Sequence, residues 1–484
     1  FLGIVAIAAI VRLAHLRDSL WLDELHTAWA VGAGFREIPH RAAIGNQSPL
    51  YFSGLWCWVQ LLGRSELTLR LPSVFAGVGL VAAAGWVAYR WTARRTAACL
   101  AAWLLAVDPT CLFYAQEARP YAWVQWIGLL QVAVWFQLLQ VAGRRLRMTW
   151  IALSLLLFYL HYTAAILLAA EAVAYVLLLA WPRFPVRYRP RQLTRDASAF
   201  LLGCVPAVPQ LLAIADRREN WAAFVRERPL NELATAFFPL WLCVTLPILC
   251  VVAAWLFVWL GRRIASNPSP WSWADWWSEG AGGEATAAVD GLPKASAAHS
   301  AARWSAAILL CFCWLFVPLI LTWSTTHLGL ARLFFLRYVL VATAAPVLLS
   351  SLVIRAGPTA YWRLASCLIV GAVALSQSGI LYGLVREGRV APDRNQDWRG
   401  AIAWLNREAA AAPGPVLIRS GLIESDALRE DPQNADLRAY CLLPVTGLYL
   451  LGVDDSRQVA LTMTQAGRLA VADRERVRNA GQAW

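Results

Sequence analysis

The charged residues that could carry out chemistry lie in short polar segments of an otherwise apolar chain. Asp23 and Glu24 follow the first apolar run. On a helix, Asp23 would share one face with His26 and Thr27, which lie three and four residues later. A carboxylate held there could take the proton of a hydroxyl group as a general base. Adjacent acids in a first helical turn also stabilise the helix dipole, so the pattern alone leaves both roles open.

Other polar segments add positive charge that is predicted to face the same side as Asp23. They contain Arg70 at the start of an apolar run, Glu117 and Arg119 in a short loop, and Arg332, Arg337 and Tyr338 before a late run. Guanidinium groups bind phosphate through paired hydrogen bonds, although an arginine at a membrane edge can also snorkel to lipid headgroups. A phosphate ester is already a good leaving group, so displacing it needs positive charge more than a general acid. The set therefore fits attack by an acceptor on a lipid-linked phosphate sugar.

The elements that must position these residues are transmembrane helices. Of the 484 residues, 59% are hydrophobic and 15% are charged, against about 25% charged residues in ordinary soluble domains. Apolar runs near 20 residues recur from Phe1 to about Tyr382, and a helix of that length crosses the hydrocarbon core of a bilayer. In lipid every backbone amide needs an internal partner, and these runs lack the two-residue alternation of barrel strands. We expect an all-α polytopic membrane protein.

The basic residues predict the orientation in the membrane. The formal net charge of +13 comes from arginines grouped in short loops, as the positive-inside rule describes, so we expect no nucleic-acid partner. The cytoplasmic clusters are Arg90, Arg94 and Arg95; Arg144, Arg145 and Arg147; Arg183, Arg187, Arg189, Arg191 and Arg195; and Arg262 and Arg263. If Pro49–Leu62 crossed the membrane, the first three clusters would lie outside. We therefore predict that Pro49–Leu62 is an interfacial helix on the outer surface.

About eleven spans follow from these rules, with the N-terminus inside and the C-terminus outside. They cover residues 1–16, 71–89, 96–113, 120–142, 148–160, 163–181, 197–214, 236–260, 304–323, 338–354 and 361–382. The fifth span, Met148–Leu160, is short because 13 residues give about 20 Å of helix against about 30 Å of hydrocarbon. His161 should therefore lie below the outer surface, where it either lines a cavity or is satisfied by a neighbouring helix.

The composition divides the chain into two domains. Residues 1–382 are predicted to form the membrane domain, with a first outer loop at 17–70 that holds interfacial helices. A low-complexity loop at 262–303, rich in Ala, Gly, Ser and Pro, is predicted to be cytoplasmic. Residues 383–484 are expected to form a small α/β domain outside the cytoplasm, with a size that can hold its own core.

Within the predicted outer domain, Asp397–Ala411 has helical spacing and residues 415–421 resemble a buried strand that ends at a glycine. The chain begins at Phe1 rather than methionine and ends at Trp484 without a clear stop. We therefore treat the N-terminus as a candidate truncation and the outer domain as a candidate fragment.

The cysteines give no sign of a metal site. Most of the ten cysteines lie inside apolar runs, and their spacing is not that of metal ligands. We interpret them as small buried residues rather than as a disulfide framework. The sequence predicts no cofactor with certainty, and it leaves open whether a divalent cation assists the leaving phosphate.

Five short motifs, in their order along the chain, resemble those of the bacterial branch of glycosyltransferase family 39. They are Asp23-Glu24, Ser48-Pro49-Leu50-Tyr51, Leu69-Arg70-Leu71-Pro72, Glu117-Ala118-Arg119-Pro120-Tyr121 and Arg337-Tyr338. The resemblance covers about residues 1–382, and Asp397-Trp398-Arg399 is also similar to the start of the outer domain in bacterial members. It implies the GT-C fold and an inverting transferase that uses a polyprenyl-phosphate sugar as donor.

The resemblance also implies roles for individual residues. Asp23 matches the acidic position that family members use as the catalytic base. Arg70 matches a near-invariant family arginine, and Arg337 with Tyr338 matches a donor-side pair. His161 falls where some relatives place a lysine that could meet phosphate, and a histidine there would be cationic only if its pKa lay at or above ambient pH.

Two departures from the lipid A branch of that family leave the acceptor unassigned. Residues 47–49 read Gln-Ser-Pro where that branch has Glu-Lys-Pro, which argues against aminoarabinose transfer and against a metal site built on that glutamate. Arg119 precedes a proline where the branch has an aspartate, and Glu117 could supply a carboxylate nearby. We expect Arg119 among the donor-binding residues. The residues expected in supporting roles are Glu24, Gln47, Ser48 and Glu117.

These inferences predict a polyprenyl-phosphate sugar donor, a glycan, lipid or protein acceptor, and a site on the outer face of the cytoplasmic membrane. A transporter or flippase of lipid-linked sugars would also need many spans and outward cations. It is less favoured because the chain shows no internal repeat and its polar groups cluster at the outer interface rather than at the midplane. A non-catalytic assembly protein with a partner-binding outer domain is a third alternative.

Overall fold

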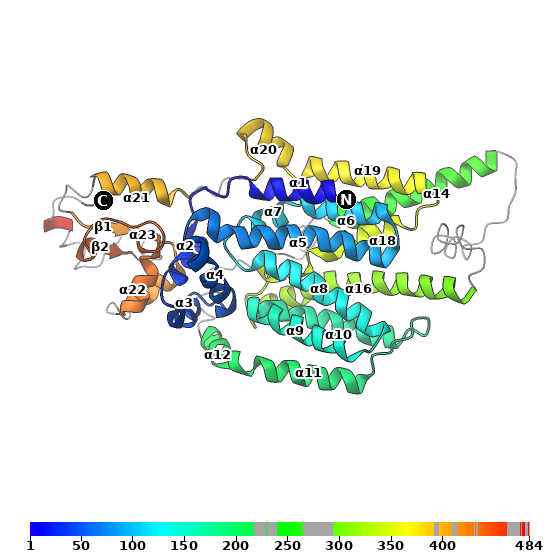
Figure 1. Cartoon of the computed structure of the whole chain (residues 1–484), viewed down its shortest axis with the longest axis horizontal. Helices are drawn as coiled ribbons and strands as arrows, with labels where there is room; N and C mark the ends of the chain where they lie inside the picture. Colours follow the sequence, from blue (N-terminus) through cyan, green and yellow to red (C-terminus); the bar gives the residue numbers. More distant parts are fainter. Residues whose placement is uncertain are drawn as a thin grey trace.

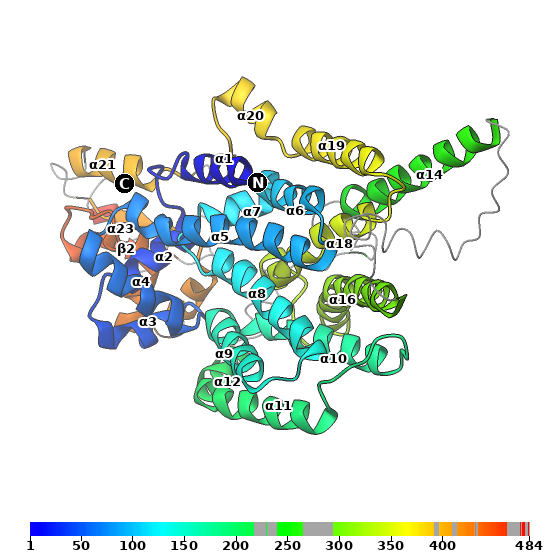
Figure 2. The same cartoon turned by 45° about the vertical axis from the view of Figure 1, so that its right-hand side comes forward.

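The computed structural model describes residues 1–216, 240–264, 294–391, 396–408, 414–429 and 434–461, together with a few isolated positions. Within these residues the protein is a bundle of long helices, with a smaller group of short helices and strands at one end (Figures 1 and 2). The predicted all-α polytopic membrane protein is confirmed. Of the predicted cytoplasmic loop, residues 265–293 lie outside the described residues, and so does much of the chain after residue 461.

Eight helices in the described part of the chain are long and apolar enough to cross a membrane, and a bent pair makes a ninth. The eight cover α5 (Glu66–Thr92), α8 (Tyr121–Gln140), α10 with its preceding turn (Tyr162–Leu179), α11 and α12 (Pro190–Asp216), α14 with its preceding turn (Trp241–Gly261), α16 from Ser300 to His327, α17 and α18 (Leu336–Ile354) and α19 (Ala360–Gln377). The bent pair joins α6 (Arg95–Val107) to α7 (Pro109–Ala115) at 64°.

Two of the predicted spans form shorter helices. Helix α1 (Leu2–Leu13) has 12 residues and α9 (Arg144–Leu160) has 17, which correspond to about 18 and 25 Å. Helix α9 begins four residues before the predicted start at Met148, because its first turn includes arginines assigned to the preceding loop. His161 terminates α9 with extended backbone, and the chain then turns into α10.

The last predicted span is also shorter than expected. Helix α19 ends at Gln377, and Gly379 adopts a φ of 75° before the short helix α20 (Ile380–Glu387) begins. This left-handed conformation favours glycine and interrupts the hydrogen-bond ladder of a helix. The apolar composition of residues 378–382 predicted a continuous helix, but the backbone turns at Gly379.

The bend between α6 and α7 brings the loop that holds Glu117 and Arg119 toward the segment between α1 and α2. Asp108 accepts a hydrogen bond from the amide of Cys111 at 2.5 Å and so caps α7, with Pro109 in the first helical position. Arg12 donates to the carbonyls of Leu105 and Ala106 at 2.8 and 3.2 Å. The break in the helix therefore leaves its carbonyl groups hydrogen-bonded, as a membrane interior requires.

Helix α5 connects this bundle to the polar end of the molecule. Ser65 caps its first turn by accepting a hydrogen bond from the amide of Thr68 at 3.2 Å. With 27 residues, α5 is about 40 Å long and exceeds the hydrocarbon thickness of about 30 Å. Arg70, in the second turn of α5, therefore lies at the polar end of the bundle.

Three short helices, α2 (Leu22–Ala30), α3 (Ile38–Ile44) and α4 (Pro49–Leu62), lie together at this end of the bundle (Figure 1). Helix α4 has the bounds predicted for the interfacial helix, with Pro49 in the first position. The structure places α4 at the end of the bundle, where it contacts α3, α5 and α9 (Figure 1).

The chain after α20 packs on the same end. It forms α21 (Trp398–Glu408), α22 (Ala435–Cys441), α23 (Leu443–Thr446) and a two-stranded parallel sheet. The sheet pairs β1 (Val416–Ile418) with β2 (Gln458–Ala460). A helix and a strand are thus present within the segments where the sequence predicted them, and α23 contacts α2 directly.

Candidate active site

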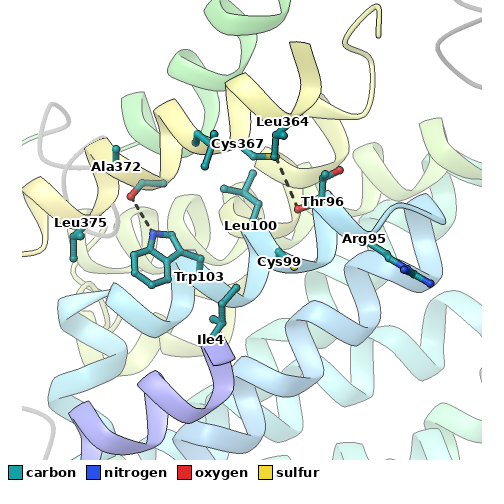
Figure 3. A pocket seen from close by; sticks show the side chains of 12 residues that line it. Ile4, Arg95, Thr96, Cys99, Leu100, Trp103, Leu364, Cys367, Ala372 and Leu375 are labelled. Carbon is teal, nitrogen blue, oxygen red and sulfur yellow. Dashed lines mark hydrogen bonds between the residues drawn. The ribbon is translucent and has the colours of Figure 1, made fainter. Parts of the chain in front are cut away.

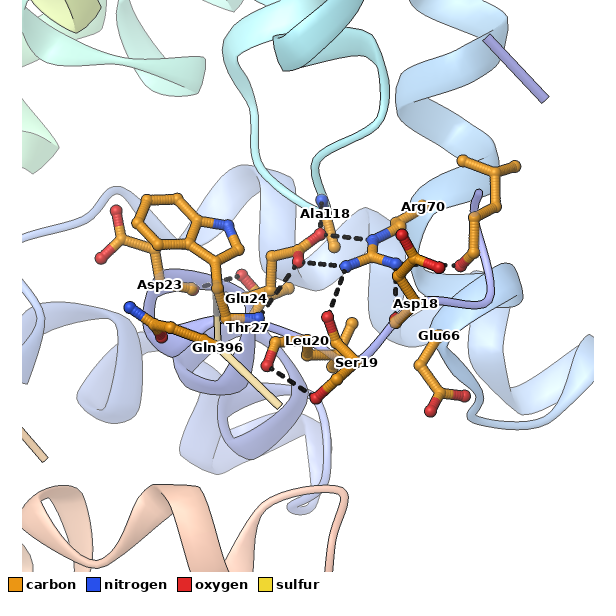
Figure 4. A network of polar contacts seen from close by, with 12 residues as sticks. Asp18, Ser19, Leu20, Asp23, Glu24, Thr27, Glu66, Arg70, Ala118 and Gln396 are labelled. Atoms are coloured by element: carbon orange, nitrogen blue, oxygen red, sulfur yellow. Dashed lines mark hydrogen bonds and ion pairs between the residues drawn. The ribbon is translucent and has the colours of Figure 1, made fainter. Parts of the chain in front are cut away.

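Glu24 and Arg70 form a buried ion pair that anchors α2 to α5 (Figure 4). Arg70 Nε and Nη2 donate to the two oxygens of Glu24 at 2.7 and 2.5 Å, in the paired geometry that makes such contacts strong. Both side chains are buried, with 2% and 0% of their surfaces exposed. The amide of Ala118 also donates to Glu24 Oε1 at 2.8 Å, which connects the loop between α7 and α8 to the ion pair.

Arg70 uses all five of its N–H donors inside the protein. Besides Glu24, its Nη1 donates to the carbonyls of Leu16 and Asp18 at 3.0 and 2.8 Å, and its Nη2 donates to the carbonyl of Ser19 at 3.2 Å. A guanidinium group has five donors in a fixed fork, so no donor is left for a phosphate. The expected donor-binding role of Arg70 is therefore corrected: Arg70 fixes the turn between α1 and α2.

Asp23 has different surroundings, although it is adjacent to Glu24. Its carboxylate points away from the buried pair (Figure 4). Arg337 Nη1 donates to Asp23 Oδ2 at 3.2 Å, and 23% of the Asp23 side chain and 18% of the Arg337 side chain are exposed. The structure thus brings together two predicted site residues that lie 314 positions apart in the chain. Asp23 therefore keeps a partly exposed carboxylate beside a cation.

Arg119 is the second cation beside Asp23. It is 3% exposed, and its Nη1 donates to the backbone carbonyl of Asp23 at 3.2 Å. Its guanidinium carbon lies 5.7 Å from the centre of the Tyr121 ring, and Ser73 holds its backbone carbonyl through a 3.1 Å hydrogen bond. Arg119, in the loop before α8, and Arg337, in α17 (Leu336–Val339), therefore approach α2 from two different parts of the chain and concentrate positive charge around Asp23.

His26 is a neighbour of this site that the predicted set of site residues did not contain. Its Nδ1 lies 3.3 Å from Arg119 Nη1, and its Nε2 lies 3.2 Å from the carbonyl of Arg41. Because arginine only donates and a carbonyl only accepts, the ring must carry its proton on Nε2 and accept on Nδ1. Burial, and then the charge of Arg119, lowers the pKa of His26 to about 4. The sequence feature that could have identified His26 as a site residue is its spacing of three residues from Asp23 on a helix.

Aromatic rings from three parts of the chain enclose the site. The ring of His161 lies 5.7 Å from those of Tyr121 and Tyr338, and 9% of His161 is exposed. Burial, and then the charges of Arg119 and Arg337, lowers the pKa of His161 to about 3. His161 is therefore neutral at pH 7 and would meet a phosphate as a hydrogen-bonding ring rather than as a cation.

The other residues expected in supporting roles connect the elements around the site. Ser48 donates a hydrogen bond to the carbonyl of Tyr159, and the carbonyl of Gln47 accepts one from Gln210 at 2.5 Å. These contacts hold the start of α4 against the ends of α9 and α12. Glu117 is fully buried in the loop before α8, where its carbonyl accepts from the amide of Arg119 at 2.8 Å.

The arrangement combines a reachable carboxylate, two guanidinium groups and a wall of aromatic side chains. A carboxylate can remove a proton from a hydroxyl group, and paired arginines can stabilise a departing phosphate. Among the described residues, no group of three or more His, Cys, Asp and Glu side chains is arranged to hold a metal ion.

No protein-family model matches the chain, and no curated protein matches it. Two solved structures are similar to it, both of ArnT from Cupriavidus metallidurans. The first, in the apo state, has a TM-score of 0.44 and 14% sequence identity, and the match covers 93% of this chain and 74% of that one. The second, bound to undecaprenyl phosphate, has a TM-score of 0.45 and 14% identity, and the match covers 93% of this chain and 75% of that one.

Proposed function

We propose that this protein is an inverting membrane glycosyltransferase of the GT-C type. The proposed reaction moves a sugar from a polyprenyl phosphate to a hydroxyl acceptor. The observation that carries the proposal is the contrast between two adjacent carboxylates. Glu24 is buried against Arg70, whereas Asp23 is partly exposed beside Arg337 and Arg119. A buried, fully paired acid has a structural role, and a reachable acid flanked by two cations suits attack on a phosphate-linked sugar.

In the proposed reaction Asp23 is the general base. It accepts the proton of the acceptor hydroxyl as that oxygen forms a bond to the anomeric carbon. The bond from this carbon to the phosphate oxygen breaks at the same time, and its electron pair leaves with the polyprenyl phosphate. Because acceptor and leaving group occupy opposite faces of the sugar, the configuration at the anomeric carbon inverts.

Arg337 and Arg119 are proposed to receive the phosphate. In the structure Arg337 contacts Asp23 at 3.2 Å, and a phosphate group would compete for its N–H donors. Donor binding would then move Arg337 from the carboxylate to the phosphate and leave Asp23 available to the acceptor. Arg119 is held by His26 and by the Asp23 carbonyl, so it offers a fixed charge. Tyr338 and the neutral ring of His161 would complete the donor side.

The side of the membrane follows from the arginine clusters. We place Asp23, the first outer loop and the chain from residue 383 onward on the outer face of the cytoplasmic membrane, because the clusters between spans are predicted to be cytoplasmic. A glycan, lipid or protein hydroxyl on that face would be the acceptor. The membrane supplies the donor, because a polyprenyl phosphate is anchored there by its chain.

Sugar transfer by purified protein in liposomes tests the proposal against a flippase of lipid-linked sugars. Radiolabelled polyprenyl-phosphate sugars would be offered together with a panel of glycan, lipid and protein acceptors. A transferase moves label to an acceptor and releases unlabelled polyprenyl phosphate in equal amount. Label that stays on the polyprenyl lipid and appears in the opposite leaflet would support the flippase instead.

A further inference from the structure

Helix α20 (Ile380–Glu387) projects sideways from the long helices in both views of the molecule (Figures 1 and 2). Among the described elements it packs mainly on α19, to which the turn at Gly379 joins it. Leu381, Leu384 and Val385 share one side of α20 by helical spacing, and each is exposed, Val385 to 83%. These three side chains are called the apolar face of α20, and such a patch marks an interaction surface.

The chain folds back over the other side of α20 and leaves the apolar face open. Gly388 ends the helix with a φ of 64°, and the amide of Arg389 then donates to the carbonyl of Gly383 at 3.2 Å. A Cβ atom at Gly383 would lie 2.5 Å from the Arg389 carbonyl oxygen, so the returning chain passes close to this side. A surface helix in water turns its apolar face toward the protein, whereas α20 turns that face away.

Helix α19 provides a membrane-facing surface that α20 continues. It is one of the candidate spans, and Figure 3 shows the hydrogen bond that Trp103 Nε1 of α6 donates to the carbonyl of Gly371 at 3.0 Å, which holds one side of α19 on the bundle. Ile369 of the same helix is exposed. Since α19 ends at Gln377, three residues before α20 begins, the lipid around α19 extends to the base of α20.

The residues beside the apolar face suit the boundary between lipid and water. Tyr382 and Arg386 lie four residues apart on a neighbouring side of α20, and both are exposed. Tyrosine is enriched at membrane interfaces, and a long arginine side chain extends from apolar surroundings to the headgroups. With eight residues, α20 is about 12 Å long and cannot cross the bilayer. This pattern is typical of a helix that lies in the plane of the interface.

We propose that α20 is an interfacial helix whose apolar face inserts into the bilayer leaflet on the side of Asp23. Arg389, just after α20, forms an ion pair with Asp18 in the segment between α1 and α2. The bilayer surface is thereby connected to the segment that precedes Asp23. A second copy of the chain is the rival occupant, but a stable interface needs about 800 Å² from each partner, more than three side chains supply. The membrane contact does not depend on the proposed transfer reaction.

Photo-cross-linking of the full chain in phosphatidylcholine nanodiscs tests this contact. With p-benzoylphenylalanine in place of Val385, irradiation should add the mass of one phospholipid to the protein, as it should with the same replacement of Ile369 in α19. Trp404 is the matched control, because it is 48% exposed in α21, which lies beyond the long helices (Figure 1), and its replacement should gain no lipid. A cross-link between two copies at Val385, no adduct there, or equal adducts at Val385 and Trp404 would overturn the proposal.

Hydrogen–deuterium exchange in the same nanodiscs gives a second readout. Leu384→Glu with Val385→Glu places charge on the apolar face and should detach α20 from the lipid. Its amides should then exchange about tenfold faster, because an isolated helix of this length is marginal in water. Unchanged exchange in α5 and α8 shows that the bundle is folded. Glu387→Gln, at an exposed position of α20 outside the apolar face, should exchange like the wild type. Wild-type exchange in the doubly charged variant would contradict insertion.

Discussion

Asp23 and Glu24 are neighbours in α2, yet the protein uses their carboxylates differently. Glu24 accepts hydrogen bonds from Arg70 and from the amide of Ala118 in the interior. Asp23 forms an ion pair with Arg337 at a partly exposed position. At the scale of single residues, the proposed function depends on this separation, because one acid holds the site together and the other is free to meet a substrate.

Replacing Arg337 with glutamine should weaken donor binding. A hydrogen bond to a charged group contributes about 1.5–3 kcal/mol, so the donor KM should rise about 10- to 100-fold while kcat changes less. Initial rates over a range of donor concentrations measure both constants. Arg36→Gln, an exposed arginine in the first outer loop, is the control. A purely structural Arg337 would instead lower the amount of folded protein and leave the donor KM unchanged.

The free energy of unfolding should fall in acid because two buried histidines must become protonated. The pKa values of His26 and His161 are lowered from 6.5 to about 4 and about 3. Their unfolded forms bind protons first, so stability is complete above pH 6.5 and is lost as the pH falls toward 4. For His26 alone the loss is about 3 kcal/mol. Thermal unfolding in detergent from pH 7.5 to 4.5 should show a weaker pH dependence in His26→Asn; an equal dependence would contradict this assignment.

The sequence predicted Asp23, Arg119 and Arg337 as site residues but could not show that they meet. Asp23 and Arg337 are 314 residues apart, and their contact depends on how α2 and α17 pack, which no local pattern encodes. Arg70 illustrates the opposite difficulty. Its place at the start of an apolar run fitted donor binding, and its five internal hydrogen bonds become visible only in three dimensions.

At the scale of elements, the position of α2 depends on α5. Arg70 lies in the second turn of α5 and joins the Leu16–Ser19 turn to Glu24. The direction in which α2 leaves the bundle, and therefore the direction of Asp23, follows from this set of contacts. Helix α4 shows what the sequence can predict about an element, because its predicted bounds agree with the structure. The turn at Gly379 was missed, because the last predicted span was drawn straight through it.

Arg70→Gln should destabilise the protein rather than weaken donor binding. Removing one partner of a buried ion pair leaves Glu24 uncompensated and costs about 3–5 kcal/mol. The midpoint of thermal unfolding should fall, and the protein that remains folded should bind donor with an unchanged KM. Arg64→Gln, an exposed arginine two residues before α5, should change neither quantity. A raised donor KM without loss of stability would return Arg70 to the donor site.

At the scale of the whole molecule, the chain from residue 396 onward packs around α2 at one end of the bundle. Tyr440 packs on His26 and Trp29 with ring centres 5.4 and 5.7 Å apart, and Tyr449 donates to Glu66 at 3.0 Å. These contacts link the proposed outer domain to the helix that carries Asp23. Composition predicted an α/β segment there, but docking between distant surfaces has no local sequence signal.

Tyr440→Ala should loosen this docking. Deleting a large buried ring costs about 3–5 kcal/mol, so the segment after residue 396 should be cleaved faster in limited proteolysis and the transfer rate should fall. Tyr440→Phe keeps the ring and should behave like the wild type. Tyr361→Ala removes a tyrosine that is 72% exposed and serves as the control. Unchanged proteolysis in Tyr440→Ala would show that the segment does not depend on this contact.

The most direct test of the central proposal compares Asp23→Asn with Glu37→Gln, an exposed acid of the same outer loop, in sugar transfer under saturating donor. Removing a general base lowers rates about 10²- to 10⁴-fold, so Asp23→Asn should lose transfer to that extent while its thermal unfolding stays close to that of the wild type. Glu37→Gln should keep the wild-type rate. Transfer by Asp23→Asn at the wild-type rate would contradict the account.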